Sequence, residues 1–486
     1  MPEESEFLSL SIDMTGEKAE VVSEYGIKLK IETLNAHAIC KNLTKLKTMG
    51  MVLVASLLLS SIAFYNGYPL VYPDTGSYIS LKDNLFRSFF YNLFVFPSSW
   101  LQSLWPVVFL QSLIVAHLLF VVLRSVFGMN SPPIFFAVTT LLCLVSNLPW
   151  FTGFIMPDIF TGVLILSLFL IVFCWPSLGL GEKIYFFILT VISITVHLSH
   201  IPIAVGLLIC ASLLRVTMQN RHAMIRHHVW QGWVAVCVAL VSLLSNGYRH
   251  QNMLTLSPNG YCFLLARLIV DGPATLYLRD NCAERKYALC DYLNQIPATS
   301  DEFLWAAESP FCKVGWISGY RSEGIEIIKE TIRHYPFLII KNAFRNMVSQ
   351  LPMINNWYGL CSYMNSSHPT HDIRKHYPGD FHAYATSKQS LNQLSLNAFN
   401  RLHSAVIRLS LPLIALMFFI FLKRRHYLPA LFLITIVSAY VLSSFVTGAL
   451  SVPHDRYGSR IIWLLPFFSI ASLTHEIVFW RNDKGI

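Results

Sequence analysis

Long stretches without a charged side chain constrain this chain more than any other feature. Residues 48–73 contain no Asp, Glu, Lys or Arg, and similar apolar runs recur along the 486 residues. A helix of about 20 apolar residues crosses the hydrocarbon core of a bilayer. The composition agrees, because 54% of the residues are hydrophobic and only 13% are charged, whereas about a quarter of a soluble domain is charged. The sequence therefore predicts an all-α polytopic membrane protein.

The charge-free runs predict about ten transmembrane helices. The interval 184–214 is ambiguous, because a single helix there would be about 46 Å long and would need a strong tilt. Its motif HLSHIP, with Pro202, favours a break into two helices. The predicted spans are roughly 48–70, 104–123, 132–150, 158–176, 184–198, 200–214, 229–247, 405–422, 427–450 and 460–478.

The distribution of Lys and Arg sets the orientation. With two helices in 184–214, the basic residues beside the apolar runs fall on one side, which the positive-inside rule makes cytoplasmic. We therefore expect both termini in the cytoplasm and the chain in a bacterial inner membrane. The net charge of +9 needs no nucleic acid to explain it, and nucleic acid is excluded as a partner. The basic residues concerned are Lys41, Lys45, Lys47, Arg124, Arg215, Arg221, Arg226, Lys423, Arg424, Arg425, Arg481 and Lys484.

This topology divides the chain into four parts. A cytoplasmic tail, 1–47, precedes a transmembrane module, 48–247, whose first outer loop is 71–103. An extracytoplasmic domain, 248–403, is followed by C-terminal transmembrane helices within 404–480. The stretch SEGIEIIKETIRHYPFLIIKNAFRNM in the extracytoplasmic domain predicts an amphipathic helix, and the domain is expected to be mostly helical.

Five cysteines lie in the predicted extracytoplasmic domain, where the compartment permits disulfides. The odd number leaves at least one of them unpaired within the chain. We expect at least one disulfide, most simply between Cys282 and either Cys290 or Cys312. The other two cysteines are Cys262 and Cys361.

The motif YPDTGSY places Asp74 where the first span leaves the membrane. An aspartate there could simply end a helix. However, Pro73 and Gly76 make a compact turn, and the aromatic stretch SFFYNLFVFPSSWLQSLW that follows is typical of a helix lying in the membrane interface. A partly desolvated carboxylate in such a place suits a general base. We predict that Asp74 is catalytic and that Tyr78, in the same turn, binds substrate.

The motif MPDIF places a second acid, Asp158, at the outer start of another span. An acid in the first turn after a proline is also ordinary helix-start chemistry. The functional alternative is a carboxylate that orients the acceptor or holds a metal ion. His197 and His200 flank the break in HLSHIP, where they either bond to neighbours or line a substrate pocket, and no third ligand nearby supports a zinc site.

The motif HDRYGSR places two arginines, Arg456 and Arg460, at the outer end of the last span, against the positive-inside bias. They could anchor lipid headgroups. The alternative is a phosphate site, because arginine makes charge-assisted and often bidentate hydrogen bonds to phosphate. We include His454 of the same motif among the predicted substrate-binding residues.

Together these motifs resemble the GT-C superfamily of glycosyltransferases, and the bacterial relatives of protein mannosyltransferases and aminoarabinose transferases in particular. In that family an acid follows the first membrane helix, a second acid opens a later helix and an arginine precedes a C-terminal helix. The matching residues here are Asp74, Asp158 and Arg456. The chain departs from the family pattern in two ways: its first loop has one acid where many members have two, and ten spans are few.

The resemblance implies an inverting transfer of a sugar from a polyprenyl-phosphate donor to an acceptor on the outer face of the membrane. Asp74 would accept the proton of the acceptor hydroxyl, and Arg456 with Arg460 would stabilise the leaving phosphate. A divalent metal ion stays open as a cofactor. The acceptor is a lipid, a glycan or a protein.

Two other classes of function remain open. A lipid or glycan transporter would usually carry ionisable residues inside the membrane, and only His117 lies well inside a predicted span. A membrane O-acyltransferase would use His197 or His200 as its base, which leaves the acids and arginines of the outer face without a role.

Overall fold

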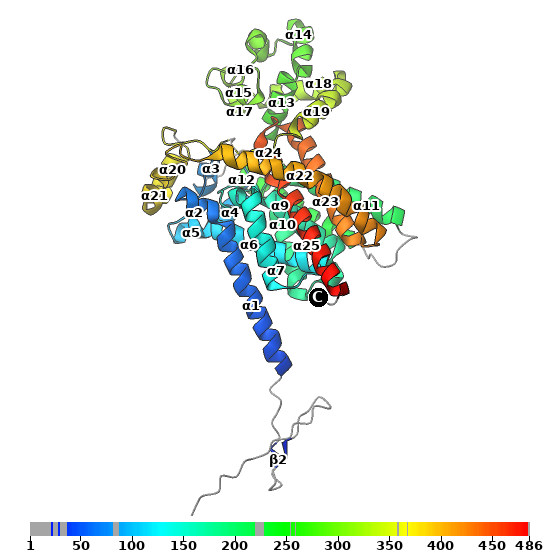
Figure 1. Ribbon diagram of the computed structural model, residues 1–486. Coiled ribbons are helices and arrows are strands. Elements are labelled where there is room, and N and C mark those ends of the chain that lie inside the picture. Colours follow the sequence, from blue (N-terminus) through cyan, green and yellow to red (C-terminus); the bar gives the residue numbers. More distant parts are fainter. Residues whose placement is uncertain are drawn as a thin grey trace, which may run out of the picture.

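The described part of the chain is helical almost throughout. Its two strands, β1 (Val21–Val22) and β2 (Lys28–Leu29), are two residues long and pair antiparallel. The predicted all-α fold is therefore confirmed in this computed structural model (Figure 1). The structure describes residues 21–22, 28–29, 36–80, 87–218, 228–252, 254–257, 259–356, 359–366 and 368–484. Most of the predicted tail 1–47, together with Arg221 and Arg226, lies outside them.

Among the described residues, five helices are long and apolar enough to cross a membrane, which indicates a multi-pass integral membrane protein. A bent pair of helices, joined at 86°, passes the same length and composition test as a unit and would make a sixth. The five are α6 (Trp105–Phe127), α12 (Val229–Gln251), α22 (Leu396–Lys423), α23 (Tyr427–Leu450) and the continuous pair α24 (Asp455–Ile462) and α25 (Leu464–Lys484). The bent pair is α13 (Gly260–Val270) and α14 (Pro273–Arg285).

The prediction of ten membrane-length helices is wrong, because the charge-free runs are longer than the helices within them. The run 158–176 contains a helix of 15 residues, about 22 Å long, which is shorter than a hydrocarbon core of about 30 Å. The run 184–214 forms two helices, as HLSHIP indicated. The other helices in these runs are α1 (Ala36–Leu59), whose apolar part is only Leu46–Leu59, and the shorter α2 (Ser61–Asn66), α7 (Pro132–Val145), α8 (Leu148–Thr152), α9 (Ile159–Phe173), α10 (Leu180–Thr195) and α11 (His200–Met218).

The main core surrounds α9, in which every residue is buried. Helices α6, α10, α12, α23 and α24 all contact α9. Because Asp158 is the residue immediately before α9, this packing places one predicted site residue at the end of the central helix of the bundle.

Short helices fill the first outer loop and the long segment before α22. The loop after α1 and α2 holds α3, α4 and α5, in agreement with the expected non-spanning aromatic stretch. Their bounds, with those of the other short elements, are α3 (Thr75–Ile79), α4 (Phe89–Val95), α5 (Pro97–Trp100), η1 (Trp175–Ser177), η2 (Ala288–Gln295), α15 (Ser300–Trp305), α16 (Pro310–Lys313), α17 (Trp316–Gly319), α20 (Thr370–His376), η3 (Pro378–Asp380) and α21 (Phe381–Ala385).

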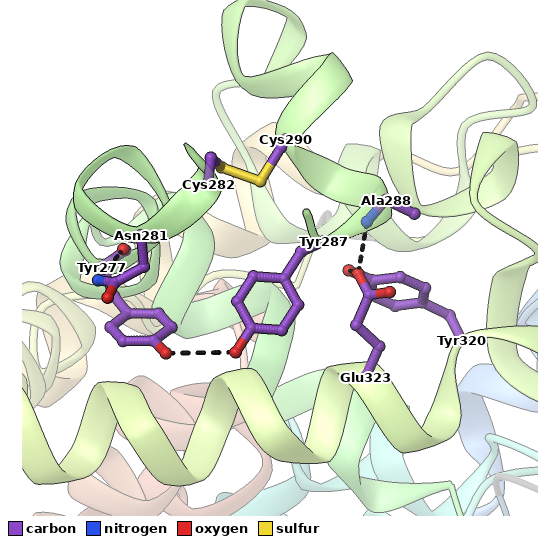
Figure 2. Close-up of a disulfide and its surroundings, with 8 residues drawn as sticks. All are labelled: Tyr277, Asn281, Cys282, Tyr287, Ala288, Cys290, Tyr320 and Glu323. Carbon is purple, nitrogen blue, oxygen red and sulfur yellow. Dashed lines mark hydrogen bonds between the residues drawn. A yellow bond between two sulfur atoms is a disulfide. The ribbon is translucent and has the colours of Figure 1, made fainter. Parts of the chain in front are cut away.

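A second hydrophobic core lies within the predicted extracytoplasmic domain and is formed by helices between Cys262 and Ile328. A disulfide joins Cys282 of α14 to Cys290 of η2 (Figure 2), which confirms one of the two pairings expected from the sequence. Beside it, the hydroxyl groups of Tyr277 and Tyr287 lie 3.2 Å apart. The disulfide therefore fastens a short loop to a packed aromatic pair.

The stretch predicted as one amphipathic helix forms two, α18 (Arg321–His334) and α19 (Pro336–Gln350). The break is at Tyr335, whose φ of −126° and ψ of 41° are not helical. Pro336 has no backbone N–H to donate and crowds the residue before it, which ends the helix there.

The rest of the predicted extracytoplasmic domain does not join the second core. Side chains in α20 and α21 and between them, including Ile373, Tyr377 and Tyr384, are buried in the main core. Helix α20 contacts α3 directly. We call residues 368–385 the returning segment, and it covers the turn that carries Asp74.

Candidate functional site

Five charged side chains from four parts of the chain meet at the end of the bundle that is predicted to face outward. We call them the charged cluster: Asp74, Arg87, Asp158, Arg456 and Arg460. Four of them are residues that the sequence singled out. The cluster joins the turn before α3, the loop before α4, the start of α9 and helix α24.

Asp74 stands at the N-cap of α3, but its side chain makes no capping hydrogen bond. Its Oδ1 accepts a hydrogen bond from Nη2 of Arg87 at 2.6 Å, and its Oδ2 lies 4.0 Å from Nη1 of Arg456. Thr75 fixes the turn, because its hydroxyl accepts from the backbone N–H of Tyr72. Asp74 is therefore directed toward the arginines and is not an ordinary helix cap.

Asp158 is fully buried and holds Arg456 with two hydrogen bonds. Nε of Arg456 donates to Oδ1 at 3.1 Å, and Nη2 donates to Oδ2 at 2.8 Å. Although Asp158 is the N-cap residue of α9, its side chain makes no capping hydrogen bond. Arg460 lies 3.7 Å away through its Nη1. The helix-start interpretation of Asp158 is thus incomplete, since its carboxylate bridges to α24.

Arg456 and Arg460 lie side by side on α24, among aromatic rings. The guanidinium group of Arg456 stands 4.3 Å from the centre of the Tyr72 ring, and that of Arg460 stands 5.2 Å from the centre of the Tyr457 ring. Arg460 is completely buried, yet its Nε and Nη1 have no hydrogen-bond partner. Buried polar groups normally have partners, so Arg460 keeps unused donor capacity next to a carboxylate.

Arg87 was not predicted from the sequence, although it is the partner of Asp74. Burial lowers the pKa of its guanidinium group, but the charge of Asp74, the Tyr78 hydroxyl and the hydrogen bond to Asp74 together outweigh burial, and the pKa is raised. The available signal was its position: an arginine in an outer loop departs from the positive-inside bias, as Arg456 and Arg460 do.

The helix break between α10 and α11 reaches the cluster through Ser199. Nη2 of Arg460 donates to the Ser199 hydroxyl at 3.4 Å, and this hydroxyl lies 2.8 Å from Nδ1 of His197. His200 uses both ring nitrogens, with the Thr161 hydroxyl at 2.8 Å and the Ser193 carbonyl at 2.5 Å. His197 therefore belongs to the edge of the cluster, whereas His200 is engaged in helix packing.

The other two predicted residues, His454 and Tyr78, are not members of the charged cluster. His454 is directed to the second core, where its Nε2 lies 3.0 Å from Oδ2 of Asp301. Tyr78 is buried, its ring 4.8 Å from that of Tyr91 and nearly perpendicular to it. Burial raises the pKa of the Tyr78 hydroxyl above its ordinary value. His454 therefore lies outside the cluster, whereas the Tyr78 hydroxyl is close enough to interact electrostatically with Arg87 and Asp74.

The returning segment packs tightly over α3 at Gly76. A Cβ atom there would collide with the carboxylate of Asp372 and would lie 3.2 Å from Nδ1 of His368. His368 and Asp372 are themselves hydrogen-bonded. Glycine at position 76 is therefore required by this close approach, in addition to the turn that the sequence indicated.

A groove of about 930 Å³ lies between α4 and the C-terminal end of α12. Arg87 lies just before α4, and Ser88 ties this start to the Thr195 carbonyl at the end of α10. The groove is mostly apolar, with an arginine at the α12 end; its lining includes Phe89, Phe90, Leu93, Val241, Tyr248 and Arg249. Its shape and chemistry would accommodate a long apolar chain.

Among the residues that the structure describes, no three His, Cys, Asp or Glu side chains are grouped to hold a metal ion. Both carboxylates of the charged cluster are directed to arginines, so we derive no chemistry through a metal. No protein-family model, no curated protein and no solved structure matches this chain. The candidate function therefore rests on the residues themselves.

Proposed function

We propose that the chain is an integral-membrane glycosyltransferase that transfers a sugar, with inversion, from a polyprenyl-phosphate donor to an acceptor at the outer face. One observation carries this proposal: three guanidinium groups, of Arg87, Arg456 and Arg460, face only two carboxylates in the charged cluster. The surplus positive charge and the free donors of Arg460 suit an additional anion such as a phosphate.

The apolar groove supports a lipid as the carrier of that phosphate. Its lining begins at Phe89, two residues after Arg87, and continues along α4 and α12. A polyprenyl chain lying in the groove would bring its phosphate to the edge of the charged cluster. The sugar would then project toward the turn that holds Asp74.

The reaction assigns different roles to the two acids. Asp74 accepts the proton of the acceptor hydroxyl as its oxygen bonds to the anomeric carbon. The bond between that carbon and the phosphate oxygen breaks on the opposite face, and its electron pair leaves with the lipid phosphate. Arg460 and Arg456 stabilise this leaving charge, an effect typically worth about 3–4 kcal/mol per donor. Asp158 is a positioning residue, because its two hydrogen bonds fix Arg456.

The two rival functions receive less support. An acyltransferase with His200 as its base is disfavoured, because both of its ring nitrogens already have protein partners. A transporter would not explain why the charged cluster lies at one end of the bundle, beside short helices, when coupling sites in carriers lie near the membrane centre.

The finer topology is part of the same proposal. We propose that both termini are cytoplasmic, in a bacterial inner membrane, and that α1 and the shorter helices α7, α9, α10 and α11 cross as well. Single cysteines placed near residues 300 and 455 should react with an impermeant reagent from outside intact cells, and those near 128 and 424 should not. Labelling at 424 from outside would contradict this orientation.

The enzymatic proposal is tested with the purified chain in vesicles containing a polyprenyl-phosphate sugar labelled in the sugar, together with extracted envelope lipids and proteins as acceptors. Asp74→Asn should lower transfer by about 10²–10⁴-fold, the usual contribution of a positioned base, and should retain binding of polyprenyl phosphate. Arg460→Ala should weaken that binding as well as the rate. Asp291→Asn, an exposed aspartate in η2, is the matched control. Undiminished transfer by Asp74→Asn would disprove the catalytic assignment.

A further inference from the structure

Helix α19 presents its apolar side chains outward. Phe337 is 86% exposed, and Ile340, Phe344 and Val348 are each more than half exposed. The spacing of these four residues places them on one face of the helix. We call this face the α19 stripe.

The opposite face of α19 is polar and buried. Asn342 and Asn346 donate hydrogen bonds to the backbone carbonyl and the carboxylate of Asp271, at 3.0 and 2.8 Å. Gln350 exchanges two hydrogen bonds with the backbone of His454, at 2.8 and 2.9 Å. A helix that packs on a domain and faces water does the reverse, burying its apolar residues. The α19 stripe is therefore better suited to an apolar environment than to water.

The position of α19 relative to a membrane-length helix supplies the second observation. It packs antiparallel along α23: the rings of Phe344 and Phe445 are 5.6 Å apart, and the Tyr440 hydroxyl donates to the Leu351 carbonyl at 2.7 Å. Tyr440 precedes Leu450, the end of α23, by ten residues, or about 15 Å of helical rise. The C-terminal end of α19 thus lies about half a hydrocarbon core below the outer end of α23.

The surroundings of the stripe match a bilayer surface. Exposed apolar residues of α23, among them Val437, Val441 and Leu450, extend the apolar surface beside α19. Lys341 and Arg345, both exposed on α19, have long stems that can carry their charges to lipid headgroups. The apolar surface and its basic border are continuous with those of a helix that itself crosses the membrane.

We propose that α19 is embedded in the outer leaflet, with the α19 stripe against lipid acyl chains. The predicted extracytoplasmic domain is then fastened to the bilayer through a half-membrane helix as well as through α12 and α22. This inference does not depend on the proposed glycosyl transfer. It does bear on the site, because Gln350 at the end of α19 holds His454, two residues before Arg456.

The test places an environment-sensitive fluorescent amino acid, inserted at a stop codon, at Phe337, Ile340, Phe344 or Val348 of the full chain. The protein is reconstituted in vesicles of phosphatidylethanolamine and phosphatidylglycerol. Nitroxides on the lipid acyl chains report contact with lipid, and iodide reports contact with water. The matched control is the same amino acid at Glu284, an exposed position of α14. All five positions are on the surface, so the substitutions leave the packed interior unchanged.

The proposal expects at least threefold stronger quenching by the lipid nitroxides than by iodide at the four stripe positions, and the opposite order at Glu284. Stronger quenching by iodide at the stripe would mean that it faces water and would overturn the proposal. Protection from both quenchers would mean that another protein or a second copy covers the stripe, which would overturn it equally.

Discussion

Replacing Asp158 by asparagine should destabilise the protein far more than an equivalent change at a less buried ion pair. The substitution keeps the shape of the side chain but removes the charge that compensates Arg456 and Arg460. It leaves three guanidinium groups facing one carboxylate. Breaking a buried pair in this way typically costs about 3–5 kcal/mol, because the remaining charge stays buried without a counter-ion.

The chain contains a matched control in the pair Arg124 and Glu182. It has the same bidentate geometry, with both N···O distances 2.9 Å, but its side chains are 28% and 25% exposed. Pairs in contact with water contribute at most about 1 kcal/mol. Glu182→Gln should therefore cost several times less than Asp158→Asn.

The free energy of unfolding can be measured by titrating the protein in mixed micelles with a denaturing detergent. A double variant, Asp158→Asn with Arg456→Gln, should recover part of the loss, because it removes one of the uncompensated charges. If Asp158→Asn costs no more than Glu182→Gln, or if the double variant loses the sum of the two single losses, the buried network does not act as a unit and this reasoning is refuted.

Two further changes test segments outside the membrane-length helices. Cys282→Ser should destabilise the second core by about 2–3 kcal/mol, which is the chain-entropy value for a disulfide loop with a sequence separation of 8. Non-reducing mass spectrometry of the native chain should find Cys282 joined to Cys290. Gly76→Ala should lower the unfolding free energy by about 1–3 kcal/mol, since its Cβ would collide with Asp372. Gly181→Ala, in a helix with no atom within 4 Å of the new Cβ, is the control and should be neutral or slightly stabilising.

The sequence could predict which residues carry charge in unusual places, but not how they pair. Asp158 and Arg456 were recognisable because each stands at the outer end of an apolar run. Their bidentate contact joins residues 298 positions apart, which no local pattern encodes. Arg87 was not predicted, because it stands directly before the aromatic stretch that indicates an interfacial helix, although the positive-inside rule applies to it as well.

The span count failed for a different physical reason. The absence of charged residues shows which segments can be buried in lipid or in a protein core. The length of a helix depends instead on where its backbone leaves the helical conformation. Ser146 ends α7 and Cys174 ends α9 inside runs that contain no charge at all. Pro336 ends the first of the two helices in the stretch predicted as a single helix. The amphipathic pattern continues across this proline, which is why a single helix was predicted.

The two acids in the charged cluster differ in burial, and this difference indicates different roles that the sequence motifs did not distinguish. Asp158 is 0% exposed and has two strong hydrogen bonds to one guanidinium group, so opening this pair would be costly. Asp74 is 17% exposed, has a single hydrogen bond to Arg87 and is 4.0 Å from Arg456. An incoming hydroxyl group can therefore reach Asp74 without dismantling the buried network, and a phosphate can pair with Arg87, which is 26% exposed, while Arg456 and Arg460 stay in place. For this reason the proposed base is Asp74, and the proposed transfer needs only the more exposed half of the cluster to move.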